Sequence, residues 1–335
     1  MPPKIRGMKN HSNLAQNPHS DLRRFTLMLS GEDALEAQGD SNQPLKGLPH
    51  ERFLLGERVP VAPVLLLGQS SVAVNPNQTI ACLQPVHLHA TRDHLILMNQ
   101  NQIDLTESES SQLLKAALPL LEEDFQGPVL FHDKQYWFIP AGPFSSLATH
   151  SIDQAHGRNI DWWMPRDSHE DGVAKRWRKL QNEIQMLWHI DTVNEIREQR
   201  GVPSINSIWI SGIGKLDAVQ PPTAITEAKK ICGEHPLLKG LAKYRDLPYC
   251  HTVQATQTTS PEDLAGTFAW LEQPESIWSM LCHALSNKQL DELLLIDFPH
   301  GKTRERIITI KDLYKKSWAF WKKSAPLTWK EIISA

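Results

Sequence analysis

One amphipathic segment, residues 173–190, constrains the fold of this 335-residue chain more than any other. Its large apolar residues recur at helical spacing, and at about 100° per residue they fall on one face. We therefore expect a long helix that packs this stripe on a core. The members of the stripe are Val173, Trp177, Leu180, Ile184, Leu187 and Trp188.

The same segment carries a second, polar row along one edge of the expected helix. Its members are Arg178, Asn182, Gln185 and His189, at spacings of four, three and four. A guanidinium and two amides suit a phosphate or carboxylate, and His189 could donate a proton to such a ligand. The alternative is a polar helix face that another segment or water covers.

A β-type segment at 205–210 follows, and it runs into an expected turn at 211–214 that contains Gly212 and Gly214. The backbone N–H groups of such a turn could bind an anion, beside Asn206 and Ser207 at the start of the strand. Arg197 could hold a phosphate, or it could complement the dipole of its helix. A purely structural turn remains the alternative, because the third glycine of a dinucleotide-binding fingerprint is missing.

The remaining segments predict an α+β (mixed α/β) fold, with a small N-terminal sheet-plus-helix unit followed by a Trp-rich helix and strand part. Thr106 and Glu109 form a capping-box pattern at the start of a helix. We expect disorder over 1–24, an N-terminal α+β unit over 25–150 and a Trp-rich C-terminal unit over 151–335. The expected strands are 25–29, 63–67, 79–83, 86–90, 94–98, 128–131, 136–139, 292–297 and 304–310, and the further helices are 260–271, 274–285 and 311–323.

All eleven tryptophans lie at or beyond Trp137, and two of them, Trp318 and Trp321, fall in the closing helix. In that helix the aromatic residues and the lysines point to opposite sides, which favours a helix docked by its aromatic face. The alternative is an interaction or nucleic-acid-binding module that uses this Lys/Trp helix.

Composition excludes several classes of protein. The formal net charge is −3, and no polybasic arm of the kind that binds nucleic acid is present. No apolar run approaches the roughly 20 residues of a spanning helix, and the start lacks a signal-peptide core. We therefore expect a cytoplasmic protein with no membrane partner. Its four widely spaced cysteines are expected to be reduced thiols.

His87 and His89 provide the strongest candidate for a metal site. Because side chains alternate along a strand, both rings lie on one face, a geometry that can ligate a metal. The alternative is the half-exposed polar face of a sheet.

Several motifs resemble the RpfE-type regulatory proteins, many of which are labelled cofactor-independent phosphoglycerate mutases. They are Pro85-Val86-His87-Leu88-His89-Ala90, Trp177-Arg178-Lys179-Leu180-Gln181-Asn182, Val193-Asn194-Glu195-Ile196-Arg197 and Asn206-Ser207-Ile208-Trp209-Ile210. The chain departs from the family pattern at Gln84, at 191–192 and at 212–214.

The resemblance implies two functions. The first is a regulatory protein that binds a small anionic, phosphorylated ligand or a protein partner through 178–214, with Asn194 among the binding residues. The alternative is a metal-dependent, cofactor-independent phosphoglycerate mutase or a related phosphotransferase. Two metal ions would then neutralise the transferred phosphoryl group. Only this second interpretation requires a divalent metal, and whether the chain is an enzyme stays open.

Overall fold

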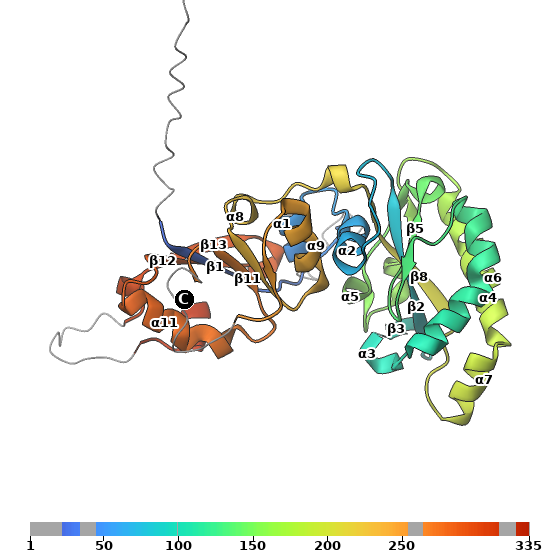
Figure 1. Cartoon of the computed structure of the whole chain (residues 1–335). Coiled ribbons are helices and arrows are strands. Elements are labelled where there is room, and N and C mark those ends of the chain that lie inside the picture. Colours follow the sequence, from blue (N-terminus) through green and yellow to red (C-terminus); the bar gives the residue numbers. More distant parts are fainter. Residues whose placement is uncertain (1–21, 34–44, 99, 254–263, 315–325, 335) are drawn as a thin grey trace, which may run out of the picture.

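A computed structural model describes residues 22–33, 45–98, 100–253, 264–314 and 326–334. The chain forms two β-sheets with helices on both, which confirms the expected α+β class (Figure 1). The helices are α1 (Pro49–Leu55), α2 (Val61–Gln69), α3 (Gln100–Ile103), α4 (Glu107–Phe125), α5 (Ile152–Ala155), α6 (Val173–His189), α7 (Thr192–Gln199), α8 (Thr223–Thr226), α9 (Pro236–Arg245), α11 (Trp278–Ser286) and α12 (Trp329–Ile333).

The first sheet has six strands in the order β10-β9-β11-β1-β12-β13, and all neighbours are parallel except β12 and β13. Phe25 and Leu27 pack on one face with α11, whereas Met28 and Phe268 pack on the other face with α1 and α9. The strands are β1 (Arg24–Met28), β9 (Lys230–Gly233), β10 (Tyr249–Cys250), β11 (Thr267–Trp270), β12 (Glu292–Asp297) and β13 (Arg304–Ile308).

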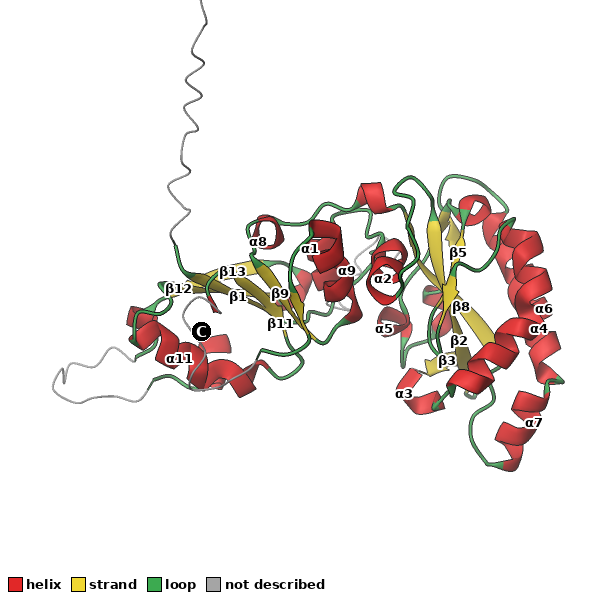
Figure 2. Cartoon of the chain, viewed as in Figure 1, coloured by secondary structure: helices red, strands yellow, loops and turns green. Residues whose placement is uncertain are grey.

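The second sheet has five antiparallel strands, in which the long strand β2 pairs with β3, β5 and β8. Helices α4 and α6 cover its outer face (Figure 2), where Trp137, Trp177 and Trp188 are fully buried. The strands are β2 (Ile80–Ala90), β3 (Leu95–Met98), β4 (Phe131–His132), β5 (Trp137–Pro140) and β8 (Ser207–Gly214), and a separate pair consists of β6 (Leu147–Ala148) and β7 (Arg166–Asp167).

Helices α2 and α9 lie between the two sheets and share one core with both. They cross at Gly68 and Gly240, where a Cβ on Gly240 would lie 2.0 Å from the Val64 carbonyl oxygen. Both glycines are therefore required by the close approach of the two helix backbones.

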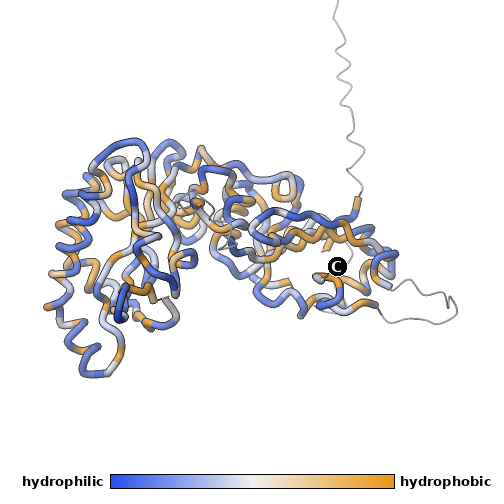
Figure 3. The backbone as a smooth tube through the Cα atoms, turned by 180° about the vertical axis from the view of Figure 1, so that it is seen from behind, coloured by the Kyte–Doolittle hydropathy of each residue, from blue (hydrophilic) through white to orange (hydrophobic). Residues whose placement is uncertain are grey.

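The expected boundary near residue 150 divides the sequence, yet strands from both sides of it build each sheet. In the six-stranded sheet β1 lies between β11 and β12, and in the five-stranded sheet β8 pairs with β2. Figure 3 shows hydrophilic and hydrophobic positions alternating along the helices outside the five-stranded sheet, as expected of helices with one buried face.

Several predicted elements are correct. Helix α6 spans Val173–His189 with the predicted stripe inward, and Leu187 is partly buried beside it. The capping box of Thr106 and Glu109 starts α4.

Three predicted elements are of the wrong kind, and the predicted strand 128–131 is shifted to Phe131–His132. Residues 63–67 belong to helix α2, because a short apolar run suits a buried helix as well as a strand. The end of the expected helix 260–271 is strand β11, and its start lies outside the described residues. The expected turn at 211–214 continues strand β8.

The expectation of four reduced thiols is also wrong. Cys232 and Cys250 form a disulfide between the paired strands β9 and β10, because parallel register places the two residues side by side. Cys82 and Cys282 are free and buried. Most of the expected closing helix, with Trp318 and Trp321, lies outside the described residues. Within the described ranges, no helix is both long and apolar enough to cross a membrane.

Candidate functional site

The predicted polar row lies on the solvent side of α6. Arg178, Asn182, Gln185 and His189 are all exposed, and the buried stripe occupies the opposite side of the helix. An ion pair between Lys179 and Glu183, with 3.6 Å between nitrogen and oxygen, runs beside the row. Helical spacing therefore predicted the position of the row correctly.

Large apolar side chains are exposed on the same helix and on the next one. Met186, one turn beyond Asn182, is 73% exposed, and Ile190 at the end of α6 is 74% exposed. Ile196 on the next helix, α7, is 53% exposed. We call these three residues and the four of the row the α6–α7 face. It combines amides, one arginine, one histidine and three apolar side chains on neighbouring helices.

Asn194 is buried inside the protein and joins two segments. Its Nδ2 donates to the carbonyl oxygens of Trp188 at 2.8 Å and Ile205 at 2.9 Å, and its Oδ1 accepts from the Ile205 N–H at 2.7 Å. These bonds tie the end of α6 to the chain that enters β8. The amide is thereby fully used within the protein.

Arg197 is fully buried, and its guanidinium is bonded on all sides by protein groups. Its Nε donates to the Pro203 carbonyl at 2.7 Å, its Nη1 to Glu109 Oε2 at 2.9 Å, and its Nη2 to the Ile103 carbonyl. Burial favours a higher pKa for Glu109, but hydrogen bonds within the capping box and the charge of Arg197 together hold that pKa below its usual value. Arg197 thus links α7 to the start of α4.

Asn206 and Ser207 also bond within the protein. Asn206 Oδ1 accepts from the Leu88 N–H at 2.7 Å and its Nδ2 donates to the Leu88 carbonyl at 3.0 Å, which extends the pairing of β2 with β8. Ser207 is buried, and its hydroxyl accepts from Gln181 Nε2 at 3.1 Å. Gln181, rather than the exposed Gln185, contacts this strand.

Gly212 and Gly214 allow the start of α2 to pack on β8. A Cβ on Gly212 would lie 2.8 Å from the Ala62 backbone nitrogen, and one on Gly214 would lie 2.5 Å from the Pro60 Cβ. The residues predicted from 178–214 therefore separate into two groups. The row on α6 faces solvent, whereas Asn194, Arg197 and the β8 residues make contacts inside the fold.

His87 and His89 lie on the same face of β2, as strand alternation predicted, with ring centroids 6.0 Å apart. His87 Nδ1 lies 2.6 Å from the Ser204 carbonyl oxygen, and burial lowers the pKa of its imidazole. Within the described part of the chain, no group of three or more His, Cys, Asp or Glu side chains could hold a metal. Zinc sites use three or four protein ligands, so two imidazoles alone do not fit a catalytic metal centre.

Sequence reasoning missed a cluster at the carboxyl ends of the parallel strands. Ser30 follows β1, His235 follows β9, Trp270 ends β11, and His50 reaches them from α1. We call these four residues the carboxyl-edge cluster. Ligands of open parallel sheets bind at this edge, but the rule applies only once the strand order is known. The short strand β9 gave no signal in the sequence.

Ring contacts hold this cluster together. His235 stacks on Trp270 with centroids 4.1 Å apart, and His50 meets the same indole at 4.7 Å. The indole Nε1 donates to Ser30 Oγ at 3.0 Å. His50 Nδ1 lies 3.1 Å from the Gly31 nitrogen, and His235 Nδ1 accepts from the Leu237 N–H at 3.3 Å.

Both imidazoles of the cluster are neutral near pH 7. Burial lowers the pKa of His50 to about 4 and that of His235 to about 3, and repulsion between the two rings lowers the latter further. Neutral imidazoles offer one donor and one acceptor each, so the cluster can form hydrogen bonds but carries no positive charge for a phosphate. The nearest arginine, Arg52, is paired with Asp33 at 2.6 Å.

Comparisons with known proteins give a fold likeness at low identity. No family model matches the chain, and no curated protein matches it. Among solved structures, it is similar to a cofactor-independent phosphoglycerate mutase from Thermoplasma acidophilum DSM 1728, at 12% identity and a TM-score of 0.36, over 85% of this chain and 89% of that one. It is also similar to the PH0037 protein from Pyrococcus horikoshii, at 12% identity and a TM-score of 0.41, over 87% and 90% of the two chains.

Proposed function

We propose that this chain is a regulatory binding protein that presents the α6–α7 face to a protein partner. One observation carries the proposal: the predicted polar row is exposed, Met186 and Ile190 on the same helix are 73% and 74% exposed, and Ile196 on α7 is 53% exposed. Large apolar side chains next to arginine and amide groups are typical of protein interfaces.

A protein suits this face better than a small anion does. A row along one exposed helix is convex, whereas small-molecule sites are concave. The groups that would complete an anion site beside the row, Asn194 and Arg197, are bonded within the protein instead. The partner half of the sequence-based hypothesis is therefore the one we retain. The resemblance to RpfE-type regulatory proteins is in keeping with a binding role.

Crosslinking in the native host tests the proposal. A photoreactive residue at Asn182, on the face, is compared with one at Lys288, an exposed position beyond α11. We expect a discrete protein adduct from Asn182 that does not form from Lys288. The same adducts in equal yield from both positions would contradict the proposal.

A matched pair of substitutions separates the face from general surface effects. Ile196→Asp removes an apolar side chain of the face, and Ile307→Asp removes one of equal exposure on β13, 55% against 53%. Loss of a hot-spot side chain weakens binding by about tenfold or more. The adduct at Asn182 should therefore decrease strongly with Ile196→Asp and stay unchanged with Ile307→Asp. Equal effects of both variants would refute the assigned face.

A further inference from the structure

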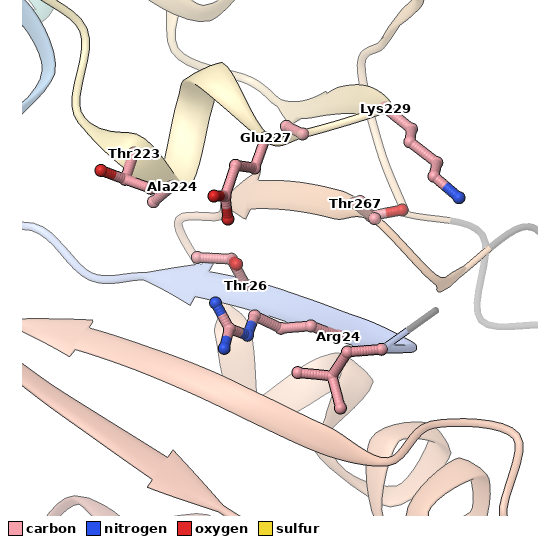
Figure 4. A pocket seen from close by; sticks show the side chains of 10 residues that line it. Arg24, Thr26, Thr223, Ala224, Glu227, Lys229 and Thr267 are labelled. Atoms are coloured by element: carbon pink, nitrogen blue, oxygen red, sulfur yellow. The ribbon is translucent and has the colours of Figure 1, made fainter. Parts of the chain in front are cut away.

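A cavity of about 570 Å³ lies between α8 and the starts of strands β1 and β11 of the six-stranded sheet (Figure 4), whereas the α6–α7 face lies on the helices of the five-stranded sheet. Ligand pockets in proteins commonly measure about 300–1,000 Å³, so this hollow has the size for a small molecule. Thr26 on β1 and Thr267 on β11 line it and are almost fully buried. The other walls come from α8 and the segment after it, with Thr223, Glu227 and Lys229.

Local contacts hold the walls of the cavity in place. The Lys229 N–H donates to the Gly266 carbonyl at 2.8 Å, and the Gly266 N–H donates to the Arg24 carbonyl at 2.7 Å. A Cβ on Gly266 would lie 2.8–3.1 Å from carbons of the Lys229 side chain, and Gly266 has a φ of +77°. Glycine at this position therefore lets the lysine stem cross the start of β11 beside the cavity.

The carboxylate of Glu227 and the guanidinium of Arg24 line the same cavity and form no ion pair with each other among the described contacts. Figure 4 shows the Glu227 carboxylate directed from α8 towards β1, and the Arg24 guanidinium lying along that strand. Arg24 pairs with Glu292 on the neighbouring strand instead, at 2.6 Å. Its Nε and Nη2 both contact Glu292 Oε1, so this pair fixes the guanidinium and leaves its Nη1 for another acceptor.

The geometry points to a binding site for a small zwitterion of the α-amino acid class. Its ammonium group lies at Glu227, its carboxylate group lies at Arg24, and the threonine-lined space receives its side chain. The lining charges favour this class over a phosphate ester, because Glu227 repels a second anionic group. The site is separate from the α6–α7 face, so failure of either proposal leaves the other standing.

Calorimetric titration of the full chain with each of the twenty L-amino acids tests this site. A separate titration with inorganic phosphate tests the alternative ligand class. We expect saturable binding of at least one amino acid at millimolar concentration. Its N-acetyl derivative and its amide should each bind about tenfold more weakly, because each lacks one of the two charges. Absence of binding by every amino acid, or tighter binding of phosphate, would overturn the proposal.

Two glutamate variants assign the binding to the cavity. Glu227→Gln removes the carboxylate that receives the ammonium group and should weaken binding about tenfold, equivalent to about 1.4 kcal/mol. Glu195→Gln alters another exposed carboxylate, on α7, and should leave the affinity unchanged. Far-UV circular dichroism confirms that both variants fold. An affinity that Glu227→Gln leaves unaltered would place the ligand elsewhere.

Discussion

The carboxyl-edge cluster makes the stability of the protein depend on pH through His50. The folded state holds this imidazole neutral, with a pKa of about 4 against the usual 6.5. A lowered histidine pKa contributes stability fully above the unfolded value and loses it as the pH falls towards the folded value. Between about pH 7 and pH 5 the unfolded chain takes up a proton that folded His50 refuses, so the free energy of unfolding falls by about 2 kcal/mol.

The wild-type protein alone does not isolate this loss, because His235, whose pKa is lowered to about 3, adds to it and a buried carboxyl group acts in the opposite direction. Burial raises the pKa of Glu51 to about 7 from its usual 4.5, and its hydrogen bond from the Leu48 N–H lowers it only in part. Glu51 contributes its full stabilisation below the pKa that it has in the unfolded chain, about 4.5. This contribution is lost as the pH rises through the folded-state pKa of about 7. The same fall in pH therefore stabilises the protein through Glu51.

Comparison with His50→Gln cancels the contributions of Glu51 and His235, which both proteins keep. Urea unfolding followed by tryptophan fluorescence gives the free energy of unfolding at about pH 7, 6 and 5. The wild-type protein should lose about 2 kcal/mol more than His50→Gln between the extremes. His169→Gln, at an exposed histidine, should lose as much as wild type. A constant difference between wild type and His50→Gln at every pH would refute a neutral, buried imidazole.

Three further substitutions test the packing described above. Arg197→Met removes the buried cation that bonds Glu109 and leaves the carbonyls of Pro203 and Ile103 without this donor, so it should lower the free energy of unfolding by about 3 kcal/mol, measured in urea. Gly240→Ala places a methyl group against the backbone of α2 and should lower the melting temperature, with a loss of about 2 kcal/mol. Cys250→Ser opens a disulfide whose cysteines are 18 residues apart and should lower stability by about 3 kcal/mol; reductant should then have no further effect, unlike in the wild type. No loss in any one case would refute the corresponding contact.

Local sequence patterns predicted those elements that are defined by their own residues, through periodic spacing or a cap. Helix α6 was predictable because Trp177, Leu180 and Ile184 repeat at helical spacing, and α4 because Thr106 and Glu109 form its cap. Helix α2 was not, because its continuous apolar run is buried between two sheets and has no polar face to reveal a period.

In the candidate site, too, features encoded within one element were predictable and contacts between distant segments were not. Exposure of the α6 row follows from spacing within one helix. The contacts of Arg197 do not, because its partner Glu109 lies 88 residues earlier in the chain. The carboxyl-edge cluster was hidden for a further reason. His50, His235 and Trp270 meet because β9, β11 and β1 are neighbours in the sheet, and no local pattern encodes that strand order.

The central position of β1 has a consequence for synthesis on the ribosome. Strand β1 is made first, but its neighbour β12 is made almost last, since the bonded residues Arg24 and Glu292 are 268 positions apart. All strands of the five-stranded sheet are synthesised earlier, because its last strand, β8, ends at Gly214. During elongation, the backbone hydrogen-bonding groups on both edges of β1 therefore stay unpaired until β11 and β12 have been synthesised, after the other sheet is complete. A nascent chain arrested after β8 therefore contains this apolar strand without either of its neighbours in the sheet.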